Sequence, residues 1–554
     1  MTEQVGVVVG GSLTKSLEVR LEPGRSAQLG QYLMAPLDGG GSLLGMVTDV
    51  LLKSAEAGAV AWPPPAGDDA ASALLRDVLL DTGVYSQVEM NPYLEIGPDG
   101  NSRARRLPRH FSAVALADQE AMDRAFDTGE RNAISLGEPL GMTGADVELF
   151  VDIERMFERS AGIFGKSGTG KTVYALQFLS ALVKHSVGQR TNQQRTVALV
   201  FDMHDDYGDY LKFEGGQRRS LKQLHPNDVT IYSLDDRSAN ADERIVIGTK
   251  DITPDDLRVL TATAEFTSAA LEAAEVFEDR LKKGWIDAVL SDGPPDALVR
   301  GLHLDEEERG DWPAALKRLD IHPGSFQNLR RNLRAITKAD FVDRGEGQFS
   351  GVLEHIVQTL LGGKSAVVQF GRHGRNLASY MLVANMLSRR IWDAYRSEME
   401  KARGDAAKEP NGLVIVIEEA HKFVDRSLAG HTIFGQIARE LRKYNVTLLV
   451  IDQRPSQIDP EVLSQIGTKF CLQLDSESDV EALVGGMQGR AGLRSVIASL
   501  ESQRQALVFG HALPMPVVVQ PPELTRDYRP GQSLRDRLNG GRAAEEVTPK
   551  GLYG

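Results

Sequence analysis

The sequence has few of the residues that mark secreted or membrane proteins. Cys471 is its only cysteine, so no disulfide can form within one chain, which fits a reducing compartment. No run of about 18 or more apolar residues occurs, so no membrane-spanning helix is predicted. The first residues lack a basic segment followed by a long apolar stretch, so no secretory signal is predicted either. We therefore expect a cytoplasmic protein without a membrane partner.

Basic residues are also fewer than acidic residues. The chain has 63 Lys and Arg residues against 77 Asp and Glu residues, a net charge of −14. This balance disfavours a surface broadly coated for nucleic-acid binding, although it permits a local basic surface such as the lining of a ring's pore. The 554 residues are 42% hydrophobic and 25% charged. These values are ordinary for a folded protein of roughly three or four domain-sized units.

Short strands separated by glycine turns are predicted in residues 1–150. Apolar and β-branched residues cluster or alternate over residues 5–9, 16–21 and 45–52, and Gly10-Gly11 separates the first two groups. Short apolar segments separated by glycine turns are typical of a small β-barrel or sandwich. We expect the unit to carry an insertion and to end near residue 150.

The sequence pattern changes near residue 151, where predicted apolar strands alternate with predicted amphipathic helices. The alternation predicts an α/β domain with a mainly parallel sheet. We assign residues 151–250 and 346–526 to this domain, with a helical insertion over 251–345 and an extended tail over 527–554. The candidate buried strands are residues 161–164, 196–201, 365–370, 413–417, 447–451 and 469–474.

The most specific motif follows the first of these strands and has the form G-x-x-x-x-G-K-[ST]. In such a loop, glycines let backbone N–H groups surround phosphates, and the helix N-terminus adds positive potential. Lys171 is expected to reach the β- and γ-phosphates of ATP, and the Thr172 hydroxyl to ligate Mg²⁺. A chance glycine-rich turn is the alternative, which the strand–loop–helix context disfavours. The motif consists of Gly165, Lys166, Ser167, Gly168, Thr169, Gly170, Lys171 and Thr172, and Val173 continues into the helix.

Two carboxylates are candidates for binding the metal ion and activating the water, which hydrolysis requires in addition to nucleotide binding. Strand 413–417 runs into Glu418 and Glu419, the arrangement of a Walker B strand. We expect Glu418 to face Mg²⁺ and Glu419 to polarise the attacking water. The alternative is a helix N-terminus with acidic residues after a core strand. Together the motifs predict a RecA-like P-loop ATPase core with a mainly parallel sheet.

Two more polar residues follow predicted strands. Gln453 comes soon after strand 447–451 and is the candidate sensor of the γ-phosphate, with an ordinary loop residue as the alternative. Asp202 follows strand 196–201 at the carboxyl edge of the same sheet, where ligands bind in open α/β folds. It is expected either to contact metal or water, or to cap a turn.

This set of residues resembles the HerA family of hexameric DNA translocases, which is related to the FtsK-type motors. The resemblance keeps its order from about residue 5 to 520 and includes that family's small N-terminal barrel, the HAS barrel. One departure is Glu418, which stands where the family usually has Asp. The matching segments are Val5-Gly6-Val7-Val8, Gly45-Met46-Val47-Thr48-Asp49, Arg159-Ser160-Ala161-Gly162-Ile163-Phe164-Gly165, Asp202-Met203-His204, Glu418-Glu419-Ala420-His421, Gln453-Arg454-Pro455-Ser456 and Ala506-Leu507-Val508-Phe509-Gly510-His511-Ala512.

The resemblance also implies roles for residues outside the loop. Arg442, with Arg439 in reserve, is expected to reach the γ-phosphate held by a neighbouring subunit and to neutralise charge in the transition state. A solvated basic helix face is the alternative for this segment. By the same resemblance, Arg159, Gly510 and His511 are expected to touch nucleotide.

The function implied by the resemblance is an ATP-dependent, Mg²⁺-dependent translocase or helicase of double-stranded DNA, built as a homohexamer. The implied partner is a nuclease, either of the NurA type in DNA-end processing or an effector in antiphage defence. Two other readings stay open. One is a nucleotide-gated assembly scaffold for a nuclease effector, and the other is a conjugation-type or secretion-type ATPase.

The residues that would touch DNA are less well marked. The loop over residues 371–376 is basic, and a second basic group lies on a predicted helix. Either group could line a pore and bind phosphates, and either could be a solvated face. No helix-turn-helix, zinc or RNA-recognition motif is found, so base-specific readout is not predicted. The helical group consists of Arg330, Arg331, Arg334 and Lys338.

Overall fold

The structure is a computed structural model of the chain, in which residues 4–521 are described apart from internal gaps. Arg442 and the expected tail over 527–554 lie outside the described residues. So do all members of the following set: 1–3, 56–82, 99, 127–132, 143–147, 190, 192–194, 209–210, 214–215, 219, 264–265, 306–307, 311, 345–348, 427–428, 431, 441–443, 488, 502–504 and 522–554.

The N-terminal unit is a closed β-barrel, as the glycine-punctuated strands predict. Its strands follow the order β2-β1-β7-β3-β4-β5, and an antiparallel pairing of β2 with β5 closes the ring. Alternate residues point into a core of their own, such as Val19 and Leu33, which are both fully buried. The strands are β1 (Gln4–Gly11), β2 (Leu17–Leu21), β3 (Tyr32–Pro36), β4 (Ser42–Ser54), β5 (Val84–Gly97) and β7 (Ala113–Leu116), with β6 (Gly100–Arg103) added beside β5.

The end of the N-terminal unit differs from the boundary expected near residue 150. After the short helix α3 (Gln119–Ala125), strands β8 (Ala133–Pro139) and β9 (Leu149–Asp152) pair with each other. β8 also pairs with a strand from the far end of the chain, so both belong to the second sheet rather than to the barrel. Alternating residues predict a strand but not the partner with which it pairs, which explains the difference.

Twelve described strands form the second sheet, and those around its centre are parallel, as predicted. The order is β15-β14-β18-β11-β19-β20-β10-β21-β22-β23-β8-β9, with parallel pairing from β15 to β21 and antiparallel pairing beyond. The strands are β10 (Ala161–Phe164), β11 (Thr196–Asp202), β14 (Val229–Ser233), β15 (Glu243–Arg244), β18 (Ser365–Gln369), β19 (Gly412–Glu418), β20 (Val446–Asp452), β21 (Thr468–Cys471), β22 (Ala506–Gly510) and β23 (Val517–Gln520).

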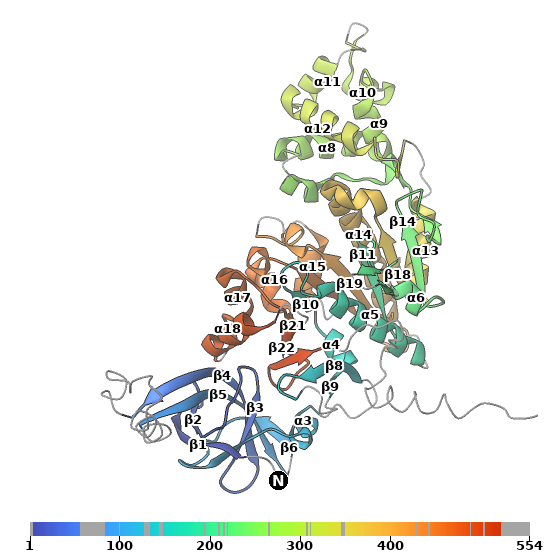
Figure 1. Cartoon of the computed structure of the whole chain (residues 1–554). Helices are drawn as coiled ribbons and strands as arrows, with labels where there is room; N and C mark the ends of the chain where they lie inside the picture. The colour runs from blue at the N-terminus through green and yellow to red at the C-terminus, as the bar shows by residue number, and fades with distance from the viewer. Residues whose placement is uncertain are drawn as a thin grey trace, which may run out of the picture.

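Helices connect these strands and make the sheet the middle of an α/β domain (Figure 1). The central strands β19 and β20 are mostly apolar because they are buried on both faces, and each ends in a carboxylate, Glu418 and Asp452. The helices are α4 (Ile153–Phe157), α5 (Lys171–Gly188), α6 (Leu221–Leu224), α13 (Phe349–Leu361), α14 (Leu377–Ala402), α15 (Ile433–Glu440), α16 (Pro460–Gln465), α17 (Glu477–Val484) and α18 (Arg490–Ser499).

Helices fill most of the segment expected to be a helical insertion, and they stand at the end of the molecule away from the barrel in Figure 1. A short parallel pair, β16 (Ile247–Gly248) and β17 (Val342–Asp343), joins the two ends of the segment. The buried carboxylate of Asp256 receives guanidinium groups from Arg389 and Arg390 of α14, which fixes this unit to the ATPase domain. The helices are α7 (Pro254–Leu257), α8 (Ser268–Leu281), α9 (Trp285–Leu290), α10 (Asp296–Leu302), α11 (Trp312–Arg318) and α12 (Pro323–Ile336), with 3-10 turns η2 (Thr249–Asp251), η3 (Arg258–Thr263) and η4 (Lys282–Gly284).

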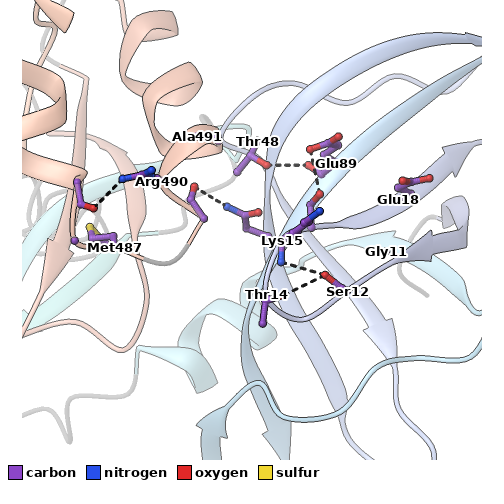
Figure 2. A pocket seen from close by; sticks show the side chains of 16 residues that line it. Gly11, Ser12, Thr14, Lys15, Glu18, Thr48, Glu89, Met487, Arg490 and Ala491 are labelled. Atoms are coloured by element: carbon purple, nitrogen blue, oxygen red, sulfur yellow. Dashed lines mark hydrogen bonds between the residues drawn. The ribbon is translucent and has the colours of Figure 1, made fainter. Parts of the chain in front are cut away.

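The barrel meets the ATPase domain at the start of α18. Figure 2 shows a cleft between the two, with Thr48 and Glu89 on the barrel side and Met487 and Arg490 on the other. Its volume is about 930 Å³. Among the residues that line it, the Asn91 side chain donates a hydrogen bond to the carbonyl oxygen of Gly489 over 3.3 Å. The two domains are therefore in direct contact.

Candidate nucleotide-binding site

The phosphate loop lies between β10 and α5, as the motif predicts. Gly168 and Gly170 have φ angles of +81° and +102°, which residues with a side chain rarely adopt. At Gly165, a Cβ atom would come within 2.8 Å of the side chains of Leu472 and Thr169. The glycines are thus required by the backbone path itself, and the loop opens at the amino end of α5, where the helix dipole favours an anion.

The Lys171 side chain is anchored on the backbone of its own motif. Its Nζ donates hydrogen bonds to the carbonyl oxygens of Gly165 and Lys166, at 2.8 and 3.0 Å. Burial lowers the pKa of Lys171, while the nearby carboxylates of Glu419, Asp452 and Glu418 act in the opposite direction. The ammonium group therefore lies near Glu418 and Glu419, the two carboxylates that the sequence predicts for hydrolysis, and near Asp452.

The strand order explains why these groups meet. β20 lies between β10 and β19, so Phe164 pairs with Asp452 and Ile451 pairs with Glu418. Because the three strands are parallel, their carboxyl ends lie at one edge of the sheet. The phosphate loop, the Walker B carboxylates and the segment after β20 are brought together at that edge.

Glu418 is a buried carboxylate at the end of β19. The Tyr207 hydroxyl donates to its Oε1 over 3.3 Å, whereas Oε2 is buried and has no hydrogen-bond partner among the described residues. Burial, followed by the nearby carboxylates of Asp202 and Asp206, raises the pKa of Glu418 well above its ordinary value. A buried oxygen without a donor is suited to a cation.

Glu419 adopts a left-handed backbone conformation, with φ of +50°. Such a conformation is unfavourable for a residue with a side chain, and in structures it clusters at functional sites. Glu418 is buried at the end of β19, and the chain turns at Glu419. The Oε1 of Glu419 accepts a hydrogen bond of 2.7 Å from the Gln453 side chain. The predicted catalytic carboxylate and the predicted sensor are therefore in contact.

Asp202 takes the second of the two roles considered for it. Its carboxylate accepts backbone N–H groups of Asp206, Tyr207 and Gly208, at 2.7, 2.9 and 3.0 Å. Burial raises the pKa of Asp202 to about 7, although the backbone donors act against this. Both oxygens accept backbone N–H groups of the turn after β11, so Asp202 holds that turn at the carboxyl edge of the sheet.

Asp206 is the carboxylate of this turn that the sequence reasoning missed. It accepts a hydrogen bond from the Thr172 side chain, and burial raises its pKa. The signal was the acidic pair Asp205-Asp206 soon after the Asp-x-His segment. The sequence pattern could not show which of the aspartates contacts Thr172, because that depends on the path of the turn after β11.

Three other predicted nucleotide contacts lie at the opposite end of the central strands. Gly467, which precedes β21, accepts a hydrogen bond from the His511 backbone, and a Cβ placed on Gly510 would come within 2.0 Å of its carbonyl oxygen. Arg159 packs against the same glycine, ahead of β10. Since β10 has 4 residues, roughly 10 to 13 Å separate this end from the phosphate loop. Within one chain, Arg159, Gly510 and His511 are not brought together with Lys171.

Three of the basic residues considered for other roles are engaged with the protein, namely Arg439, Arg372 and Arg330. Arg439 forms an ion pair with Glu461 on α16, with 3.2 Å between Nε and Oε2. In the 3-10 turn η5 (Gly371–Arg375), Arg372 pairs with Asp235, Asp236 and Asp340. Arg330 donates to the carbonyl oxygens of Leu290 and Ser291 on the helical unit. These contacts favour structural roles for Arg372 and Arg330.

The fold and the site define a P-loop ATPase with a RecA-like sheet. Two family models match the chain: "Helicase HerA, central domain" over residues 134–391 and "HAS barrel domain" over residues 5–67. The DNA double-strand break repair helicase HerA of Sulfurisphaera tokodaii is 22% identical over 93% of this chain and 92% of that protein. HerA of Pyrococcus furiosus is 22% identical over 94% of this chain and 92% of its own length. The chain belongs to the HerA family.

Solved structures show more distant similarity. The bacterial conjugative coupling protein TrwBΔN70 is 14% identical, covers 75% of this chain and 95% of its own, and has a TM-score of 0.44. Among the described helices of the present chain, none combines the length and apolar character needed to cross a membrane.

Proposed function

We propose that this chain is an ATP-driven translocase or helicase of double-stranded DNA that works as a homohexameric ring. The observation that carries the proposal is the convergence of Lys171, Glu419 and Gln453 at one edge of the sheet, next to the phosphate loop. Such a convergence suits cleavage of a terminal phosphate rather than nucleotide binding alone. The HerA relatives, named as DNA double-strand break repair helicases, support duplex DNA as the substrate.

The residues around the loop fit Mg²⁺. Glu418 offers a buried carboxylate oxygen without a described donor, and Thr172 offers a hydroxyl at the start of α5. Oxygen ligands and negative charge are what this cation requires, and when bound it neutralises charge on the phosphates. Asp206, which accepts from Thr172, would hold that hydroxyl in position.

Hydrolysis in this proposal depends on two side chains that touch each other. Glu419 orients the attacking water and accepts its proton, and Gln453 holds the Glu419 carboxylate in position through the 2.7 Å hydrogen bond. Lys171 neutralises charge that develops on the transferred phosphoryl group. Backbone N–H groups of the loop bind the remaining phosphate oxygens.

A ring is proposed because the site of one chain lacks a described arginine directed at the γ-phosphate. Arg442 of a neighbouring subunit is the proposed source, with Arg439 in reserve. Arg159, Gly510 and His511 lie too far from their own loop, so any nucleotide contact of theirs also requires a neighbour. The test is to mix Arg442→Ala subunits with Lys171→Ala subunits. Recovered hydrolysis above that of either homomeric ring supports an arginine in trans, and a fully active Arg442→Ala ring contradicts it.

The function itself is tested by measuring ATP hydrolysis with and without duplex DNA. We expect stimulation by DNA in the wild type and no turnover in Lys171→Ala, because that substitution removes the ammonium group from the phosphate site. Turnover in the wild type that does not respond to DNA of any length or end structure would contradict the proposed DNA function while leaving the ATPase assignment in place.

A nuclease is the proposed partner, in DNA-end processing or in antiphage defence. A second candidate function is a nucleotide-gated scaffold for such a nuclease, favoured by the longer Glu418 in place of the family's usual Asp and by its raised pKa. Glu419→Gln separates the two, because it preserves nucleotide binding and removes the general base. Full nuclease activation by the Glu419→Gln ring would favour the scaffold, and loss of activation would favour the motor.

A further inference from the structure

A basic segment with an exposed aromatic ring lies on the barrel and has no part in the nucleotide site. Residues 103–111, from the last residue of β6 to just before β7, read Arg-Ala-Arg-Arg-Leu-Pro-Arg-His-Phe. The segment has four arginines and no acidic residue, in a chain whose net charge is −14. Such a local reversal of charge is unusual enough to require either a structural or a binding explanation.

Two of the four arginines have a structural explanation. The Glu95 carboxylate, only 7% exposed, accepts backbone N–H groups of Arg105 and Arg106 at 2.6 and 2.8 Å, and also the Arg106 guanidinium at 2.7 Å. Although burial alone would raise it, these donors hold the pKa of Glu95 below its ordinary value. Arg109 pairs with Asp38 over 2.5 Å. The segment is thereby fixed on the barrel wall.

The guanidinium groups of Arg103 and Arg105 have no such explanation. Both side chains are exposed, and neither guanidinium has an ion pair or hydrogen bond with any residue that the structure describes. The Glu95 and Asp38 carboxylates beside the segment are paired with Arg106 and Arg109. Two free cations on a rigid backbone present positive charge without the entropy cost of ordering a loop.

Phe111 adds an apolar surface to this charge. Its side chain is 76% exposed, and its backbone is held at φ of 63° by hydrogen bonds from its own N–H to Val8 and from Ser112 to Arg109, at 2.8 and 3.1 Å. A large residue in the left-handed region is strained, so surrounding contacts must impose it. The result is an aromatic ring held out to solvent beside exposed His110.

We propose that residues 103–111 form a nucleic-acid contact on the barrel, which we call the barrel arginine segment. Arg103 and Arg105 bind phosphates of the DNA backbone, and Phe111 packs against an exposed base where a strand is unpaired. Phosphate binding by arginine together with stacking on an aromatic ring is how proteins hold nucleic acid without reading its sequence. The proposal rests on the proposed DNA function and adds a contact outside the ATPase domain.

The test measures DNA binding by Arg103→Glu/Arg105→Glu and by the neutral Arg103→Gln/Arg105→Gln. The matched control is Arg300→Glu/Lys317→Glu, which reverses two exposed cations on the helical unit. We expect the barrel variants to bind duplex DNA at least about 10-fold more weakly. We also expect their plot of log affinity against log salt to flatten by roughly two units, since about one unit is lost per phosphate contact. Hydrolysis of ATP without DNA should stay at the wild-type level, because the segment is outside the nucleotide site.

Phe111→Ala provides an independent arm. It should weaken binding of a duplex with a single-stranded tail about 5-fold or more, and binding of a blunt duplex less, because only an unpaired base can stack on the ring. Thermal unfolding of every variant serves as the folding control. The phosphate contacts of the two arginines and the stacking of Phe111 are thus tested by separate variants, and either can be contradicted without the other.

Three outcomes would overturn an assignment. Unchanged DNA affinity and salt slope in the arginine variants would overturn the barrel arginine segment as a DNA site. Unchanged DNA binding combined with lost binding of a partner nuclease would identify the segment as a protein interface instead. A wild-type ring whose hydrolysis ignores DNA would overturn the proposed function itself, which the variants alone would not do.

Discussion

The side-chain amide of Gln453 donates a hydrogen bond of 2.7 Å to the carboxylate of Glu419. Glu419 follows β19 and Gln453 follows β20, and these strands are direct neighbours in the sheet. A glutamine at this position can therefore respond to the occupant of the phosphate site by holding or releasing the proposed catalytic carboxylate. The contact makes Gln453 a positioning residue in the proposed mechanism, and its effect should appear in turnover rather than in nucleotide affinity.

The first prediction concerns that contact. Gln453→Ala should lower kcat for ATP hydrolysis about 10- to 100-fold and change nucleotide affinity little, because Glu419 loses its donor while the phosphate loop is intact. Steady-state hydrolysis and nucleotide binding, measured on the same preparation, check the prediction. A loss confined to affinity, with normal kcat, would show that Gln453 binds nucleotide and does not position Glu419.

The second prediction concerns the length of Glu418, the carboxylate proposed to face the metal. Glu418→Asp should lower kcat about 10- to 100-fold, even though Asp is usual in the family, because the shorter side chain draws away from the Tyr207 hydroxyl and from the cation position. The Mg²⁺ concentration needed for half-maximal hydrolysis should rise. Tyr207→Phe is the matched control, since it removes the hydroxyl alone. Hydrolysis by Glu418→Asp at or above the wild-type rate would contradict this account.

The third prediction separates structure from DNA contact in the basic turn η5. Arg372 is surrounded by Asp235, Asp236 and Asp340, so Arg372→Ala should leave these carboxylates facing one another. We expect the melting temperature to fall by about 1 to 3 °C, with DNA stimulation of hydrolysis unchanged. Stimulation lost at an unchanged melting temperature would restore Arg372 as a DNA contact.

The fourth prediction tests the junction between barrel and ATPase domain. A Cβ on Gly492 would come within 2.4 to 2.8 Å of Thr48, so Gly492→Ala should separate α18 from the barrel and cost about 1 to 3 kcal/mol in unfolding free energy. Alanine's better helix propensity offsets this only in part. Gly486→Ala is the control, because no atom lies within 4 Å of its added Cβ. Equal stability of the two variants would show that the junction tolerates a wider spacing.

The sequence predicted the parts of the site that are contiguous in the chain. The phosphate loop and the Glu418-Glu419 pair are short motifs between a strand and the next element, so local spacing determines their geometry. The position of Gln453 at this edge was also predicted, because the carboxyl ends of parallel strands share an edge, and its role as a sensor stays a prediction. In the same way, alternation and glycine turns predicted the barrel, and buried apolar runs predicted the parallel strands.

Long-range relationships were harder to predict. Besides its neighbour β9, β8 pairs with β23, nearly four hundred residues away along the chain, and no local pattern encodes that second pairing. Asp202 and Asp206 are chemically alike, and only the turn after β11 decides which one meets Thr172. The barrel arginine segment was missed because the importance of Arg103 and Arg105 depends on which carboxylates their neighbours Arg106 and Arg109 already occupy.

The most direct test of the central claim is displacement of a triplex-forming third strand from duplex DNA, followed with ATP and Mg²⁺ for the wild type and for Glu419→Gln. We predict that the wild type displaces the third strand at a rate that follows ATP hydrolysis. Glu419→Gln should still bind ATP and DNA but displace nothing. Displacement by Glu419→Gln at the wild-type rate, or rapid hydrolysis by the wild type on duplex DNA with no displacement, would contradict the claim that phosphate cleavage at this loop drives movement along DNA.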